Sequence, residues 1–278
     1  MRVERMLHSS RPLMMAILNV TPDSFSDGGL YLDLDVATRE AKRMVGEGAD
    51  ILDVGGESTR PGSEPVPAQE QIARVIPVIE RLRAHLPEEL PISIDTTRSE
   101  VACAALTAGA SLVNDVSAGR DDEAMLDLVA ERGASIALMH MQGTPKTMQN
   151  QPFYDDVVKE VLSFLLDRAG VAQRAGVARE RILLDPGIGF GKRKEDNLCL
   201  IANLHRFVAT GYPVLLGTSR KRFMGAVCGA TQPSELGAAT VATTALGVMS
   251  GVRVFRVHDV KQNRQAADVA AAIRHYVA

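Results

Sequence analysis

Eight short apolar segments, spaced along nearly the whole chain, constrain the fold more than any other feature of the sequence. Their apolarity is continuous rather than alternating, which is typical of strands buried on both faces in a parallel sheet. Longer amphipathic stretches separate them, so strand-then-helix units repeat and predict a single-domain (β/α)₈ barrel with residues 1–12 as a short N-terminal cap. The segments are 13–18, 51–54, 92–94, 112–113, 136–139, 182–184, 214–216 and 252–257.

The stretches between these segments carry helical patterns. Pro77 lies inside one of them and predicts a kink or a shortened helix. An open, doubly wound sheet is the competing architecture, but the first strand–helix turn lacks the glycine-rich dinucleotide-binding pattern. We therefore expect the closed barrel. The predicted helices include 36–46, 69–83, 123–131, 155–175 and 236–249.

Composition excludes several classes of function. The formal net charge of −3 provides no basic surface for nucleic acid. No apolar run approaches the ~20 residues needed to span a bilayer, so we expect no membrane contact and a cytoplasmic location. Three cysteines, Cys103, Cys199 and Cys228, lie far apart without zinc-ligand spacing. They are expected to be reduced, buried thiols.

A polar residue stands at or just beyond the end of nearly every predicted strand. In barrels of this kind, catalytic residues come from the C-terminal ends of the strands and the loops that follow them. Carboxylates and amides suit a flat heterocycle with several N–H donors, whereas Arg, Lys and His suit a phosphate or carboxylate anion. The row therefore predicts an active site at that end. It contains Asn19, Asp53, Asp95, Asn114, His140, Asp185, Ser219, Arg256 and His258.

The loops after the strands narrow the chemistry further. The loop 55–62 contains glycines beside Thr59 and Arg60, an arrangement that suits an anion. The loop 185–192 is also glycine-rich, but it lacks the spacing of a nucleotide-binding P-loop. Neither a GxSxG nucleophile elbow nor an HExxH zinc motif is present.

In these segments the chain resembles the dihydropteroate synthase family of pterin-binding enzymes. The resemblance covers the chain from residue 13 onward, and its motifs lie in order at the strand ends. It implies condensation of 6-hydroxymethyl-7,8-dihydropterin diphosphate with 4-aminobenzoate, giving 7,8-dihydropteroate and diphosphate in folate biosynthesis. The segments that carry it are 19–29, 55–62, 94–96, 114–117, 139–145, 185–192, 219–221 and 256–260.

The resemblance also implies roles for individual residues. Asn19, Arg60, Asp95 and Lys221 are expected to be catalytic, with Asn19 as the protein ligand of a Mg²⁺ ion. The 4-aminobenzoate pocket, where sulfonamides should compete, is expected to contain Phe25, Thr59, Arg60, Pro61, Ser219 and Arg220. The pterin diphosphate is expected to contact Thr59, Asp95, Asn114, Val116, Met139, Asp185, Phe190, Gly217, Lys221, Arg256 and His258.

Some expectations lie outside the substrate contacts. Asp53 and His140 have no assigned role, and we expect them to support neighbouring site residues. The resemblance implies a homodimer formed through helices late in the chain. Two rival functions stay open: a methyltetrahydrofolate:corrinoid methyltransferase, which would share the heterocycle-binding residues, and a non-catalytic pterin-binding protein.

Overall fold

The computed structural model describes residues 3–7, 11–20, 29–57 and 63–276. Within them, eight parallel strands form one sheet in the order β6-β5-β4-β3-β2-β1-β8-β7. A parallel bridge between Leu184 and Val214 joins the two ends of that order. The predicted barrel is therefore confirmed, and the open sheet is excluded. The strands are β1 (Leu13–Asn19), β2 (Ile51–Gly55), β3 (Ile92–Asp95), β4 (Leu112–Asp115), β5 (Ser135–Met139), β6 (Ile182–Asp185), β7 (Leu215–Leu216) and β8 (Val254–Val257).

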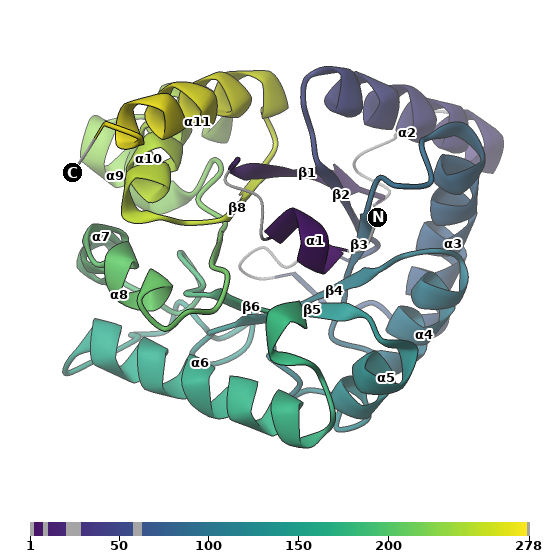
Figure 1. Ribbon diagram of the computed structural model, residues 1–278, viewed down its shortest axis with the longest axis horizontal. Coiled ribbons are helices and arrows are strands. Elements are labelled where there is room, and N and C mark those ends of the chain that lie inside the picture. The colour runs from purple at the N-terminus through teal and green to yellow at the C-terminus, as the bar shows by residue number, and fades with distance from the viewer. Residues whose placement is uncertain (1–2, 8–10, 21–28, 58–62, 277–278) are drawn as a thin grey trace.

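Helices surround the strands in a ring (Figure 1). The helix around Pro77 is not shortened, because it runs without interruption from Ala68 to His85. The α-helices are α1 (Val3–Leu7), α2 (Gly29–Gly46), α3 (Ala68–His85), α4 (Ser99–Thr107), α5 (Met125–Arg132), α6 (Val157–Arg174), α7 (Lys194–Ala202), α8 (Leu204–Val208), α9 (Arg222–Cys228), α10 (Gly237–Ser250) and α11 (Val260–Arg274). No helix in the described part of the chain is both long and apolar enough to cross a membrane.

The short helix α1 lies across the end of the barrel where the strands begin (Figure 1). Its Val3 and Leu7 pack on the inward side chains of the strand starts, among them Met15 and Ile51. Arg253 fastens it by donating to the carbonyl of Leu7 at 2.8 Å and that of Met6 at 3.1 Å. This end of the barrel is therefore filled with apolar side chains, and a substrate site must lie at the other end.

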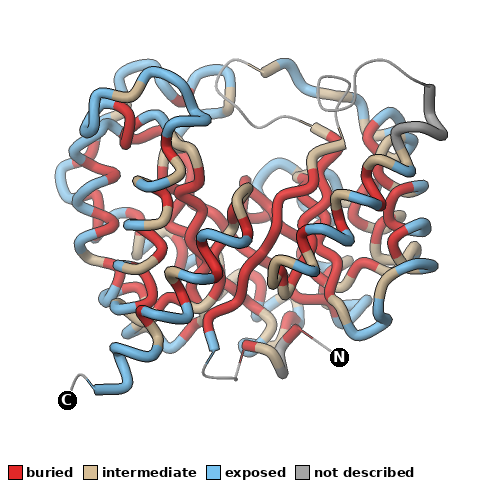
Figure 2. The backbone as a smooth tube through the Cα atoms, turned by 90° about the horizontal axis from the view of Figure 1, so that it is seen from above, coloured by how far each residue is buried: buried red, intermediate tan, exposed pale blue. Residues whose placement is uncertain are grey.

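Buried residues occupy the centre of the molecule (Figure 2), and most of their apolar side chains belong to two layers. The larger layer lies between the strands and the helices and contains side chains such as Leu52, Ile94 and Phe255. The smaller layer fills the barrel interior at the end that α1 covers. Because side chains alternate along a strand, every second residue of each strand points inward. Along β2 this inward row changes from Ile51 through Asp53 to Gly55, so the interior becomes polar toward the mouth.

The cysteines depart from the expectation of buried thiols. Cys199 and Cys228 are exposed, and Cys103 is half-buried. Cys199 lies on α7 and Cys228 ends α9, and both helices cover the outside of the barrel. A thiol on the outer face of such a helix does not pack in the apolar core. The expectation of buried thiols is therefore wrong for Cys199 and Cys228.

Candidate active site

Strand register aligns polar groups around one side of the barrel mouth. Asn19 pairs with Gly55, Gly55 with Asp95, and Asp95 with Asn114 in the parallel ladders of β1 to β4. These residues therefore share one level of the barrel. Glycine at position 55 keeps that level open, because an added Cβ would lie 3.5 Å from the Asp95 Cβ and 3.7 Å from the Asn19 Oδ1.

Arg256 on β8 joins Asp95 of this level to Asp53, two residues before Gly55 on β2. Its Nε donates to Asp53 Oδ2 and its Nη2 to Asp95 Oδ2, both at 2.6 Å. Asn114 Nδ2 also donates to Asp53 Oδ2, at 3.3 Å. The Asp53 side chain is completely buried, whereas that of Arg256 is 20% exposed. Sequence reasoning left Asp53 without a role. The structure shows that Asp53 holds the guanidinium of Arg256 inside the barrel, where the Arg256 side chain stays partly exposed.

Burial dominates the electrostatics of this group. It raises the pKa of the Asp95 carboxyl to about 7, against the opposing effect of Arg256. Burial also acts to lower the pKa of Arg256, but Asp53 and Asp95 outweigh it and raise that pKa. Asp95 Oδ1 is buried without a hydrogen-bond partner among the described residues. An acceptor left unpaired in this way is suited to an N–H donor from a ligand.

Asp185 and Lys221 face each other across the opposite side of the mouth. An added Cβ at Gly217 would lie 4.0 Å from both Asp185 Oδ2 and Lys221 Nζ. Asp185 Oδ1 accepts from the backbone N–H of Gly187 at 2.7 Å, which fixes the carboxylate. Burial raises the pKa of Asp185 and lowers that of Lys221 to about 8, while each charge opposes the shift of the other.

The loop that follows β6, residues 186–192 (the β6 loop), supplies an aromatic wall beside Asp185 and Lys221. Lys221 Nζ donates to the carbonyl of Ile188 and lies 4.4 Å from the centroid of the Phe190 ring. Phe190 packs against a small buried cluster at the mouth, formed by Val116, Met139, Met141 and Met148. The mouth therefore combines polar groups with a flat, apolar surface, as a site for a planar heterocycle requires.

The turns after β7 and β8 are tied to one another. The hydroxyl of Ser219 and the Nδ1 of His258 are 2.9 Å apart. Arg220 donates twice to Asp259, from Nε at 3.0 Å and from Nη2 at 2.6 Å. The structure thus places Ser219 and His258 together at the rim, while Arg220, expected at the 4-aminobenzoate pocket, is engaged by Asp259. Phe25, Thr59, Arg60 and Pro61 lie outside the described residues.

His140 contacts Lys192, a residue that sequence reasoning did not single out. Lys192 Nζ and His140 Nδ1 are 3.0 Å apart, and both residues are buried. Burial lowers the pKa of His140 to about 2, and the nearby Lys192 and Arg120 add to this effect. The imidazole is therefore neutral and accepts from the lysine. The only sequence signal for Lys192 was its place at the end of the glycine-rich loop 185–192.

The buried, neutral His140 should make stability depend on pH. Below its ordinary pKa of 6.5, the unfolded chain binds a proton that the folded chain does not, so stability falls as pH falls. One such group contributes about 1.4 kcal/mol per pH unit. We expect urea denaturation between about pH 7 and about pH 5 to show a shallower loss for His140→Gln than for the unsubstituted chain. Parallel curves would contradict this.

Asn19 offers an oxygen ligand for a metal at the mouth. Its Oδ1 lies above Gly55 on the same side as the Asp95 carboxylate. In the described part of the chain, no group of three or more His, Cys, Asp or Glu residues could hold a metal. Mg²⁺ is commonly bound through one or two protein oxygens together with waters and a substrate phosphate. The donors present therefore fit Mg²⁺ shared with a phosphorylated substrate.

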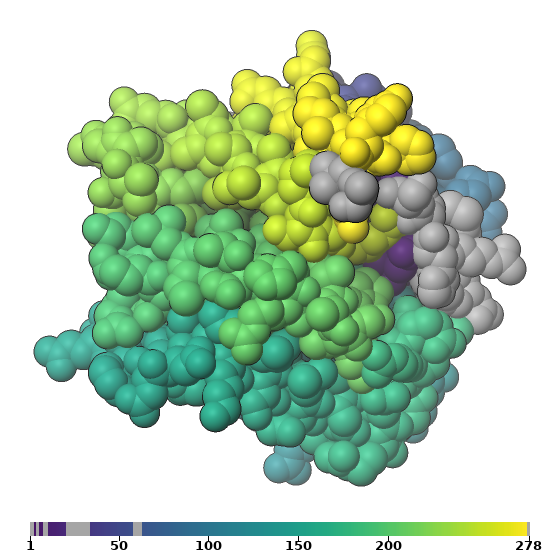
Figure 3. Space-filling view, turned by 60° about the vertical axis from the view of Figure 1, so that its left-hand side comes forward, coloured from purple at the N-terminus to yellow at the C-terminus, as the bar shows by residue number. Residues whose placement is uncertain are grey.

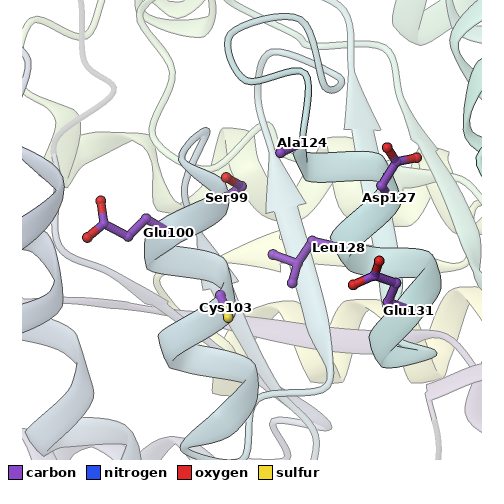
Figure 4. A pocket seen from close by; sticks show the side chains of 7 residues that line it. All are labelled: Ser99, Glu100, Cys103, Ala124, Asp127, Leu128 and Glu131. Carbon is purple, nitrogen blue, oxygen red and sulfur yellow. The ribbon is translucent and has the colours of Figure 1, made fainter.

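A second hollow lies on the outside of the barrel between α4 and α5. Ser99, Glu100 and Cys103 line one side, and Asp127 and Glu131 line the other (Figure 4). These side chains come from the outer helices, and none belongs to the strand-end row. The barrel mouth is therefore the better candidate active site.

Comparison with known proteins assigns the family. The chain matches the pterin binding enzyme family over residues 15–258. It is 46% identical to the dihydropteroate synthase of Bacillus subtilis, over 96% of this chain and 90% of the relative. The chain belongs to the dihydropteroate synthase family.

Solved dihydropteroate synthases have the same fold. The Xanthomonas albilineans enzyme with 4-aminobenzoic acid superposes with a TM-score of 0.89 at 46% identity, covering 98% of this chain and 95% of that one. The Yersinia pestis enzyme with a sulfonamide drug also gives 0.89, at 41% identity, covering 96% and 95%. The family match spans β1 to His258 and so includes every described strand-end residue of the site.

Proposed function

We propose that the chain condenses 6-hydroxymethyl-7,8-dihydropterin diphosphate with 4-aminobenzoate, forming 7,8-dihydropteroate and releasing diphosphate. The observation that carries this proposal is the mouth itself. It has buried acceptors, Asp95 and Asp185, on two sides, cations between them, and an aromatic wall at Phe190. Membership of the dihydropteroate synthase family supports the same reaction.

The pterin ring would bind between the acceptors. Asp185 accepts hydrogen bonds from the pterin amino group and a ring N–H, and Asn114 completes that edge. Asp95 accepts an N–H of the reduced ring through Oδ1, which has no hydrogen-bond partner among the described residues. Lys221 leaves the Ile188 carbonyl to donate to the ring. A site whose buried polar groups match these edges rejects analogues that leave them unpaired.

The diphosphate would lie at the rim, near Asn19, Arg256 and His258. Mg²⁺ held by Asn19 would neutralise part of its charge. The electron-rich dihydropterin can stabilise the methylene cation that remains when the C–O bond breaks and diphosphate leaves. The neutral arylamine nitrogen then forms the new C–N bond and loses a proton. Positioning and electrostatics supply most of the catalysis.

The 4-aminobenzoate would bind beside Ser219, and the residues outside the described part of the chain would complete its pocket. These residues are Phe25, Thr59, Arg60 and Pro61. Sulfonamides should compete there, because the sulfonamide complex of the Yersinia pestis relative is a precedent within the family.

Diphosphate release tests the proposal. Mixing the purified chain with both substrates should release diphosphate only when Mg²⁺ is present, and chelation should stop the release. Omission of 4-aminobenzoate should also reduce it to background. Methyl transfer from methyltetrahydrofolate to a corrinoid, without diphosphate release, would favour the methyltransferase. Pterin binding that is indifferent to Mg²⁺ and leads to no turnover would favour a non-catalytic binding protein.

We also propose a homodimer formed through α10. This helix presents an exposed apolar stripe at helical spacing, Ala238, Ala242, Leu246 and Met249. Helices from the C-terminal part of the chain, coloured yellow-green to yellow, cover this side of the molecule (Figure 3). Leu246 is 56% exposed and Met249 is 38% exposed, and a contiguous exposed apolar patch of this kind often marks an interaction surface.

Sedimentation velocity tests the dimer. We expect the unsubstituted chain to sediment as a dimer and Leu246→Glu as a monomer, because the charge would be buried in the interface. Leu166→Glu, at an exposed apolar position of α6, is the matched control and should leave the dimer intact. A monomer for the unsubstituted chain would refute the proposal.

The remaining parts of the proposal concern the whole chain. We propose that residues 1–278 act as one pterin-binding domain with residues 1–12 as its N-terminal cap. The packing of Val3 and Leu7 on the strand starts supports this. The cytoplasmic location expected from the sequence stays a prediction, which fractionation of cells that express the chain would test.

A further inference from the structure

Lys192 is a buried lysine whose partners are carbonyl oxygens and an imidazole. The residue is 3% exposed. Its Nζ lies 2.9 Å from the carbonyls of Gly187 and Phe190 and 3.2 Å from the carbonyl of His140. The fourth partner is the His140 imidazole. Burial lowers the pKa of Lys192 to about 7, because burying an ammonium is costly unless its three N–H groups find acceptors. Here four acceptors converge on the Nζ from the segments that follow β5 and β6.

The acceptors belong to the backbone that carries two proposed pterin contacts. Gly187, whose carbonyl Lys192 holds, donates its N–H to the Asp185 carboxylate at 2.7 Å. Phe190, whose carbonyl Lys192 also holds, places its ring beside Lys221. One ammonium therefore restrains the backbone that fixes Asp185 and the backbone that carries the aromatic wall.

Close packing makes the lysine difficult to replace at this point. Gly187 has a φ of +66°, and an added Cβ there would lie 1.9 Å from the carbonyl oxygen of His140. The β6 loop is thus pressed against the end of β5. Of the three carbonyl oxygens at this junction, that of Gly187 also accepts from the backbone N–H of Phe190 at 3.0 Å, whereas those of Phe190 and His140 accept from Lys192. A buried carbonyl without a donor costs about as much as a lost hydrogen bond. Without the lysine, the loop would have to move to satisfy the carbonyls of Phe190 and His140.

We propose that Lys192 is a positioning residue of the pterin site: it clamps the β6 loop to the end of β5 and so sets the place of Asp185 and Phe190. His140 completes the clamp as a neutral acceptor. This inference rests on the proposed function, because it takes the mouth to be the pterin site. It assigns Lys192 no contact with substrate.

The test compares binding with folding. Lys192→Met keeps an unbranched side chain of similar length but removes every donor. We expect its dissociation constant for dihydropterin diphosphate, measured by calorimetry, to rise by about 10- to 100-fold. The KM for 4-aminobenzoate should change by less than about threefold, because the clamp does not adjoin Ser219. Lys159→Met, at an exposed position of α6, is the control and should bind pterin normally.

The outcomes separate this inference from the proposed function. If the unsubstituted chain does not bind dihydropterin diphosphate, the proposed function fails and this inference fails with it. If the unsubstituted chain binds but folded Lys192→Met binds equally well, only this inference is overturned. A lower melting temperature with equal losses for both substrates would show a general structural role and would overturn it too. If Lys192→Met does not fold, the same criteria apply to Lys192→Gln, which retains one donor group.

Discussion

Replacing Asp185 with alanine is expected to abolish useful pterin binding. In the proposed complex this carboxylate accepts two hydrogen bonds from the heterocycle, and hydrogen bonds to charged groups contribute about 1.5–3 kcal/mol each. The dissociation constant for dihydropterin diphosphate should therefore rise by roughly 100-fold or more. The substitution also removes the negative charge that opposes the lowered pKa values of Lys221 and Lys192. Calorimetry with the diphosphate substrate measures the effect.

Two variants make the Asp185 result specific. Asp185→Asn keeps the size of the side chain but exchanges one acceptor for a donor, so it should also bind weakly. Cys199→Ala, at an exposed position of α7, should bind as the unsubstituted chain does. Micromolar binding by Asp185→Ala would refute the role given to this carboxylate.

Replacing Arg256 with methionine should remove activity and also destabilise the fold. Asp53 and Asp95 would keep their buried positions but lose the guanidinium that now lies 2.6 Å from each. Removing one partner of a buried ion pair typically costs about 3–5 kcal/mol, because a charge is left unpaired. The free energy of unfolding, measured with urea at neutral pH, should fall by about that amount.

The pH dependence of this loss identifies its cause. Burial already raises the pKa of Asp95 to about 7, and removal of Arg256 should raise it further. As pH falls, Asp95 becomes protonated and neutral, so the deficit of Arg256→Met should shrink. Arg220→Met is the matched control: its partner Asp259 is partly exposed, and such pairs contribute only about 0–1 kcal/mol. Equal stability of Arg256→Met and the unsubstituted chain would contradict the prediction.

The barrel could be predicted from sequence because its signals are local. A strand buried on both faces must be apolar along its length, and eight such segments were visible without any knowledge of contacts. The strand ends were predicted slightly short. β3 extends to Asp95 and β6 to Asp185, because a polar residue that points into the barrel mouth ends an apolar run without ending the strand.

The partners within the site could not be predicted in the same way. Arg256 and Asp53 are 203 positions apart, and the sequence does not indicate which of several carboxylates a given cation will meet. The contact of Arg220 with Asp259, 39 positions away, is likewise not indicated by the sequence. His140 had no assigned role until the fold placed it beside Lys192.

The row of polar strand ends was therefore determined by the sequence, since a residue that follows an apolar strand in a (β/α)₈ barrel must lie at its mouth. The tertiary structure decided how the row is divided. Closure of the barrel sets the register between strands, and alternation along each strand sets which side chains point inward. These two geometric facts bring Arg256 between Asp53 and Asp95 and bring Lys192 against His140. Neither pairing follows from local sequence, because the partners are far apart in the chain and meet only when their strands pair.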